Sequence, residues 1–159
     1  MLIRLAAALA FLALVVALFR FAMGLRAAKL VRAAARAAAE AGGRRVVAEI
    51  PLPEGLVLFL EDDSGFYWGD RAVRKRDLVG GRMRLGAGVV ASFGGEAGGP
   101  DDPPPEDAGE GRERWDVVLR LRDGAAAVVP CGGVREGISR EAARQVFDAV
   151  RRGAEQEAG

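Results

Sequence analysis

The chain has 159 residues, of which 50% are hydrophobic and 28% are charged, and its net charge of +1 gives no bulk attraction for nucleic acid. It contains no histidine and one cysteine, Cys131, which excludes histidine-based catalysis, histidine-ligated metals and an intramolecular disulfide. No acid–base, nucleophile or metal-ligand constellation stands out. We therefore expect a protein that is not an enzyme and has no cofactor.

The first predicted element is an apolar helix that contains one charge, Arg20. Fifteen uncharged residues separate Arg4 from Arg20, and as a helix they would span about 22 Å, short of the ~30 Å hydrocarbon core of a bilayer. The apolar run resumes after Arg20 and reaches Leu25, and an arginine near a helix end can extend to the headgroups. We predict an uncleaved transmembrane helix at 1–25; the alternatives are a signal peptide cut shortly after Arg20 and a buried soluble helix.

A basic helix is predicted from 26 to 43, where Gly42 and Gly43 end it. Its cations recur at steps of three and four residues, and together with Arg20 they form a juxtamembrane basic face: Arg20, Arg26, Lys29, Arg32 and Arg36. The face is either the solvated side of a stalk helix or a contact with anionic headgroups. We favour the stalk, because the opposite side of the helix is rich in alanine, which anchors poorly in a membrane. Because these charges follow the apolar run, we expect the N-terminus outside the cell inner membrane and the rest in the cytoplasm.

Short strands are predicted after the helix, separated by turn residues. Their segments are 44–50, 56–62, 65–69, 72–79, 82–93, 114–122 and 125–130. Within 82–93, Arg82 and Arg84 alternate with Met83 and Leu85, which predicts a half-buried strand.

The segment 94–111 interrupts these strands with six glycines, four prolines, six acids and no base. We expect it to be a disordered loop in a long hairpin. An amphipathic helix is predicted from Ser139, a favourable N-cap residue, to Arg152, and a flexible tail is predicted at 153–159.

In its order of elements, the part from 44 to 152 resembles bacterial pleckstrin-homology-like (PH-like) domains. The resemblance is carried by GFYWGDRAVRKRDLVGG at 65–81 and by VVLRLRDGAAAVVP at 117–130, which a helix follows. It implies an α+β fold, a small antiparallel β-barrel or sandwich closed by a C-terminal helix, without catalytic residues. Many proteins of this kind are membrane proteins with a cytoplasmic PH-like domain.

These observations predict a single-pass, membrane-anchored interaction module, or an accessory subunit of a membrane complex. The expected partners are membrane lipids and another membrane protein. The alternative is an exported β-domain that signal-peptide cleavage releases to bind a periplasmic partner.

The candidate contact for an anionic lipid or an acidic partner is a basic cluster: Arg71, Arg74, Lys75, Arg76, Arg82 and Arg84. The simpler interpretation, which we favour, is that these side chains face water on strands whose edges they protect. The acidic loop could also fold back over them.

Three further segments have a functional interpretation beside a structural one. Glu61–Gly65 could bind a divalent cation but lacks the pattern of a calcium loop, so a turn is expected. Phe66, Tyr67 and Trp68 alternate faces, so at least one is expected in the core. Cys131, with no histidine in the chain, is expected to be an inert thiol.

Overall fold

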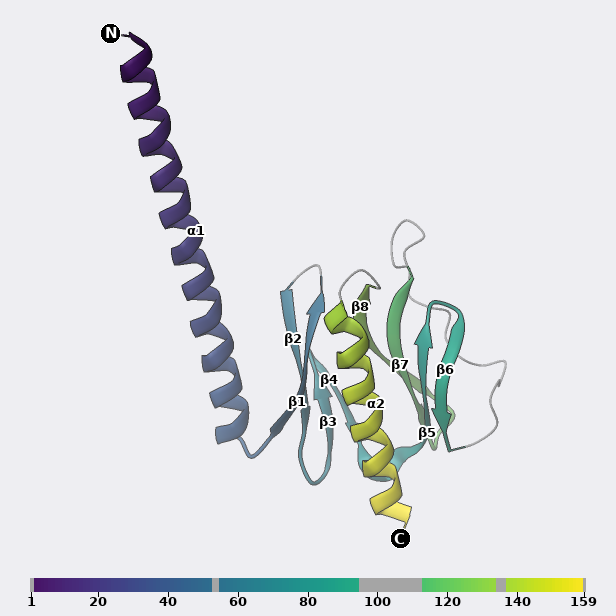
Figure 1. The fold of residues 1–159 in the computed structure, drawn as a ribbon. Helices are drawn as coiled ribbons and strands as arrows, with labels where there is room; N and C mark the ends of the chain where they lie inside the picture. Colours follow the sequence, from purple (N-terminus) through teal and green to yellow (C-terminus); the bar gives the residue numbers. More distant parts are fainter. Residues whose placement is uncertain (1, 53–54, 95–112, 134–136, 159) are drawn as a thin grey trace. The chain divides into compact units, whose positions relative to one another are not determined.

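The computed structural model describes residues 2–52, 55–94, 113–133 and 137–158, and the chain divides into two compact units. The first is Met1–Ala41, the helical unit, and the second is Gly42–Gly159, the β-domain. The predicted acidic loop falls almost entirely in 95–112, outside the described residues (Figure 1).

The helical unit consists of one helix, α1 (Leu2–Ala41), which passes through Arg20 without a break. Its end is marked by Gly43, whose φ of +74° is a left-handed conformation that favours glycine after a helix. The predicted apolar and basic segments are therefore parts of one helix. Judged on the described residues, neither helix of the chain has an apolar stretch sufficient to cross a membrane.

The β-domain contains two antiparallel four-stranded sheets among its described residues. The first sheet has the order β1 (Arg45–Leu52), β2 (Gly55–Glu61), β3 (Gly65–Trp68) and β4 (Arg71–Arg74). The second has the order β6 (Gly88–Phe93), β5 (Leu78–Leu85), β7 (Arg114–Leu121) and β8 (Ala126–Gly133). A 3₁₀ turn, η1 (Lys75–Asp77), joins the two sheets.

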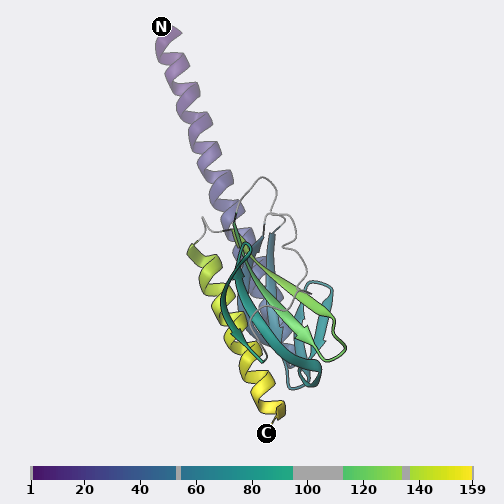
Figure 2. The ribbon, with the colours of Figure 1, turned by 90° about the vertical axis from the view of Figure 1, so that its right-hand side faces the viewer.

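The sheets pack as a sandwich covered by α2 (Gly137–Ala158), which contacts β1, β5, β7 and β8 (Figures 1 and 2). The predicted α+β class and the sandwich with a closing helix are confirmed. Two predicted strands are each divided, however. The segment 72–79 contains η1 between β4 and β5, and 82–93 turns at Gly86, where φ is +55°.

The core joins both sheets to one face of α2. Phe59 stacks on Phe66 with ring centroids 5.6 Å apart, and both rings are fully buried. The helix contributes buried apolar residues at helical spacing: Ala143, Val146, Phe147 and Val150.

The closing helix continues to Ala158, beyond Arg152, where the sequence pattern placed its end. Gly153 lies within this continuation, where it is buried and packs against the sandwich. A Cβ atom at this position would lie 2.8 Å from Cζ of Phe66. Instead of starting a tail, this glycine lets the helix approach the sheet closely.

Candidate functional site

The structure divides the predicted basic cluster into two groups. Arg71, Arg74 and Arg76, on β4 and η1, are exposed, and we call them the outer arginines. The other three side chains, Lys75, Arg82 and Arg84, are buried. A single contact surface made of all six is therefore not present on the folded domain.

Lys75 is held inside the domain by Glu61, at the end of β2. Its Nζ lies 2.9 Å from Oε1 of Glu61, and Oε2 of the same carboxylate accepts a hydrogen bond from Arg45. Nζ also lies 5.4 Å from the centre of the Phe66 ring. This charged cluster connects β1, β2 and η1, so the role that the geometry gives Lys75 is structural.

Two opposing effects act on the pKa of Glu61. Burial alone would raise it, but the hydrogen bonds and positive charges of Arg45 and Lys75 outweigh burial and hold the pKa below its ordinary value of 4.5. The carboxylate is therefore kept ionised and paired in the folded protein.

Arg82 and Arg84 lie on β5 opposite Val118 and Asp116 of β7. Their exposed fractions are 3% and 4%, so the expectation of a half-buried strand that presents both arginines to water is overturned. β5 is an inner strand, paired with β6 on one side and with β7 on the other. Nη2 of Arg84 lies 3.9 Å from Oδ2 of Asp116.

Asp116 itself is fully buried and belongs to a charged group on β5 and β7. Its Oδ1 accepts a hydrogen bond of 2.8 Å from Nε of Arg114. Charge-assisted hydrogen bonds of this kind offset part of the free energy needed to bury a carboxylate.

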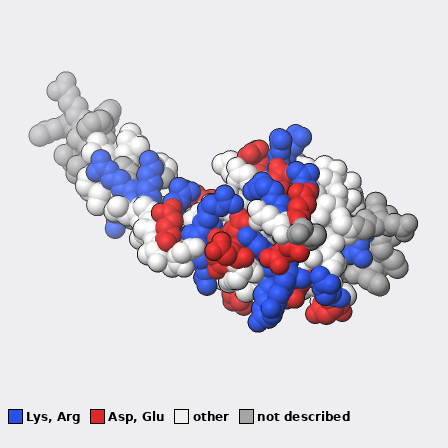
Figure 3. Space-filling view, turned by 90° about the horizontal axis from the view of Figure 1, so that it is seen from below, with Lys and Arg blue, Asp and Glu red and all other residues white. Residues whose placement is uncertain are grey.

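The outer arginines lie in a region of mixed charge. Nε of Arg76 is 3.9 Å from the carboxylate of Asp77, and the carbonyl oxygen of Arg76 accepts a hydrogen bond from Arg122. Viewed from this end of the domain, basic and acidic side chains are interspersed (Figure 3). Any attraction for an anionic surface is therefore weak and local.

The segment Glu61–Gly65 forms a turn. Oδ1 of Asp62 accepts hydrogen bonds from the backbone N–H groups of Ser64 and Gly65, at 2.8 and 2.9 Å. Burial would raise the pKa of Asp62, but these bonds together with the hydroxyls of Ser64 and Tyr67 outweigh burial and lower it. Within the described part of the chain, no three acidic, histidine or cysteine side chains gather as a metal site.

The three consecutive aromatics of β3 divide between core and surface. Phe66 and Trp68 are buried, and Tyr67 is half-buried beneath the guanidinium of Arg44, which lies 4.0 Å from the ring centre. The Tyr67 hydroxyl is 3.0 Å from Oγ of Ser64. The one partly accessible ring is thus covered by the chain itself.

Cys131 is fully buried, and its thiol donates a hydrogen bond of 3.4 Å to the carbonyl of Val129. Burial raises the pKa of the thiol strongly, with a smaller contribution from the charge of Asp116. The thiolate is therefore not formed at neutral pH.

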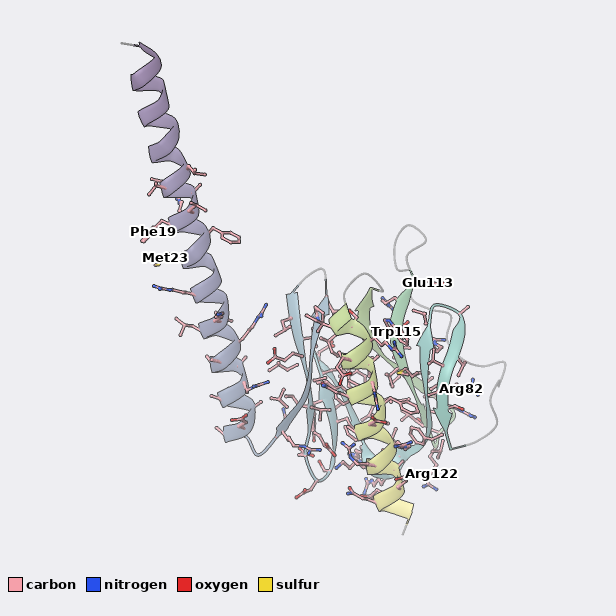
Figure 4. All side chains as sticks on the ribbon, in the orientation of Figure 1. Phe19, Met23, Arg82, Glu113, Trp115 and Arg122 are labelled. Carbon is pink, nitrogen blue, oxygen red and sulfur yellow. The ribbon has the colours of Figure 1, made fainter. Side chains whose placement is uncertain are left out.

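A run of exposed apolar side chains lies on α1. Seven large apolar side chains between residues 14 and 23 are 44–67% exposed: Leu14, Val15, Val16, Leu18, Phe19, Phe21 and Met23 (Figure 4). The five cations of the juxtamembrane basic face are exposed as well. The described part of α1 therefore combines an exposed apolar segment with an exposed basic one.

The ion pair of Glu61 and Lys75 was missed by reasoning from sequence, as was the buried Asp116. A partial signal exists for Asp116, since it is the one acid inside the strand segment WDVVL. No local signal exists for Lys75, because its burial depends on α2, which begins at Gly137, far later in the chain.

Comparison with known proteins identifies no relative: no family model, no curated protein and no solved structure matches the chain significantly.

Proposed function

We propose that the chain is a single-pass membrane protein whose β-domain serves as a non-enzymatic interaction module or accessory subunit on the cytoplasmic side. The observation that carries the proposal is the exposed apolar surface of α1 between Leu14 and Met23. Large apolar side chains that remain exposed over a contiguous surface mark a contact with a membrane or another protein.

The distribution of these side chains favours lipid over a single partner helix. Leu14, Val15 and Val16 are consecutive, and successive helical residues are about 100° apart, so they cover more than one face. A partner helix needs only a stripe with spacings of three and four residues. An apolar surface around the helix suits a lipid environment.

The charges on α1 support the proposed orientation. Arg20 and the rest of the juxtamembrane basic face follow the apolar segment, on the side toward the β-domain. The positive-inside rule then favours a cytoplasmic β-domain and an external N-terminus.

For the β-domain, we propose a PH-like module. Two antiparallel sheets followed by a C-terminal helix support this assignment, although the domain has eight described strands where the sequence predicted seven. Such a domain would present a surface to a partner in the same membrane, close to its own anchor.

The experiment compares two leucine substitutions on α1 in a bacterial host. Leu14→Arg places a charge inside the apolar segment, whereas Leu30→Arg places one beside existing charges; the two side chains are 56% and 71% exposed, so neither change disturbs packing. An arginine near the centre of a membrane helix costs about 2.5–3.5 kcal/mol. We expect alkaline extraction to release the Leu14→Arg protein and to leave the Leu30→Arg and unmodified proteins in the membrane.

The mass of the mature N-terminus separates the proposal from the exported alternative. An intact chain through Leu25 supports the anchor, and a chain that starts after Arg20 contradicts it. Equal alkaline extraction of the Leu14→Arg, Leu30→Arg and unmodified proteins would also contradict the membrane anchor.

A further inference from the structure

One face of the second sheet is buried although it does not belong to the core. Side chains alternate between the two faces of a strand, and the paired residues Met83 and Val117 lie in the core. Their neighbours along each strand therefore point to the opposite face, which we call the back face. It carries five residues with exposed fractions between 0% and 6%: Arg82, Arg84, Asp116, Val118 and Val128.

The described elements do not account for the burial of the back face. Apart from its own strands, the second sheet packs mainly against α2 and β1, and both of these contribute residues to the core. The face of an antiparallel sheet that points away from the core is ordinarily in contact with water. Val118, an apolar residue, is nevertheless fully buried there.

The connection from β6 to β7 has the end points that a cover of the back face needs. Both strands pair antiparallel with β5, which lies between them, so they run in the same direction. The connection leaves Gly94, beside Gly80 at one end of β5, and returns to Glu113, beside Gly86 at the other end. It therefore travels about 20 Å back along the sheet, and the core already fills the other face.

The length and charge of this connection also suit the back face. It comprises residues 95–112, outside the described residues, and 18 extended residues reach up to about 60 Å. It has one base, Arg112, and six acids: Glu96, Asp101, Asp102, Glu106, Asp107 and Glu110. The back face offers the guanidinium groups of Arg82 and Arg84, and opposite charges attract strongly where water is excluded.

We propose that the acidic segment 95–112 binds the back face of the second sheet in its own chain. Its carboxylates approach the guanidinium groups of Arg82 and Arg84, and its backbone excludes water from the paired valines Val118 and Val128. The acidic partner of these two arginines is then a segment of the same chain, and neither arginine belongs to a surface for anionic lipid.

The test compares how well a cysteine on each face of β7 is protected from a maleimide, in the full chain solubilised in detergent. Val118→Cys places a thiol on the back face, and Val117→Cys places one in the core; both native side chains are fully buried. The native Cys131 is fully buried and contributes no background. We expect both new thiols to react slowly while the native segment is present.

Replacing residues 95–112 by a glycine–serine segment of equal length should remove the cover. We expect Val118→Cys to react at least ten times faster in this background, while Val117→Cys stays protected because the core is intact. Equal protection of Val118→Cys with either segment would overturn the proposal. Rapid labelling of Val118→Cys beside the native segment would overturn it as well.

A milder change tests the contribution of charge. Replacing the six acids of the segment by Asn or Gln should speed the labelling of Val118→Cys at least threefold. The matched control neutralises three Asp and three Glu that are exposed elsewhere on the β-domain, and it should leave the rate unchanged: Asp63, Asp70, Asp123, Glu141, Glu155 and Glu157.

Equal labelling rates in these two neutralised variants would contradict the proposal. Protection of Val118→Cys that falls as the purified protein is diluted would also contradict it, because the cover would then come from another copy of the chain.

Discussion

Glu61 is the residue on which two cations depend, because its two carboxylate oxygens are shared between Arg45 and Lys75. The exposed fractions of the Lys75 and Glu61 side chains are 8% and 11%. A charge that is buried this far needs its partner, since removing one partner leaves the other desolvated and uncompensated.

We expect Glu61→Gln to lower the free energy of unfolding by about 1 to 3 kcal/mol, because Lys75 loses its charged partner. Chemical denaturation measures the effect. The control is Glu155→Gln, at an exposed carboxylate paired with Arg151 on α2, where the expected change is below about 0.5 kcal/mol. Equal effects at the two sites would show that the Glu61 pair does not stabilise the fold.

Lowering the pH should weaken the ion pairs of Glu61 with Arg45 and Lys75 and so reduce the free energy of unfolding. The pKa of Glu61 is lowered in the folded state from its ordinary value of 4.5, so the unfolded chain takes up this proton first as the pH falls. The stabilisation is complete above 4.5 and is lost as the pH drops toward the folded-state pKa. Asp62 acts in the same direction.

The free energy of unfolding of the unmodified protein should therefore fall more steeply below about pH 4.5 than that of Glu61→Gln. A denaturation series over this pH range checks the prediction, and the difference between the two curves isolates Glu61 from Asp62. Parallel curves would contradict it.

At the scale of elements, α2 depends on Gly153 for its close approach to β3. A Cβ atom there would meet Cζ of Phe66 at 2.8 Å and Cδ of Lys75 at 3.4 Å. Lys75 has a flexible side chain that can move, but Phe66 is fully buried and stacked on Phe59.

Gly153→Ala should therefore destabilise the domain by about 1 kcal/mol, although alanine in an open helix position stabilises by up to about 1 kcal/mol. Adding Phe66→Leu to the unmodified protein and to Gly153→Ala gives a double-mutant cycle. With the Phe66 ring absent, Gly153→Ala should lower the free energy of unfolding by less. Stabilisation by Gly153→Ala alone would show that the helix and sheet have room to separate.

The outer arginines, Arg71, Arg74 and Arg76, test whether the end of the domain at β4 and η1 contacts anionic lipid. Changing all three to Gln should lower the binding of Gly42–Gly159 to anionic vesicles several-fold, and binding of the unmodified fragment should weaken above about 0.15 M salt.

The matched control for the outer arginines removes three charges from α2 by changing Arg144, Arg151 and Arg152 to Gln. Arg144 and Arg151 are already close to Asp148, at 3.8 and 3.6 Å, so this triple change should affect binding less. Equal losses would indicate that net charge alone governs binding.

For the whole molecule, the orientation proposed for the anchor can be tested with a new cysteine. The native Cys131 is fully buried and cannot report on access. In intact cells, Ile138→Cys should resist an impermeant maleimide, and it should react after the membrane is opened. The unmodified protein should stay unlabelled in both conditions, and labelling of Ile138→Cys before opening would reverse the orientation.

The class of fold was predictable from sequence because its signals are local. Alternating strand segments, glycine turns and the apolar face of α2 each identify an element within one short window. The outer arginines were also named correctly as exposed side chains. The burial of Lys75, Arg82 and Arg84 was not predictable, because it depends on which elements far apart in the sequence become neighbours in the fold.

The contact of β1 with β8 and α2 has a consequence during synthesis. The first strand of the domain finds these neighbours only in its last two elements, which a ribosome makes about 5 to 20 s later. Until then, the apolar surface of β1 and β2 has no finished core to enter, while α1 has already been completed. The order of synthesis therefore completes the N-terminal helix before the β-domain has all the elements of its core.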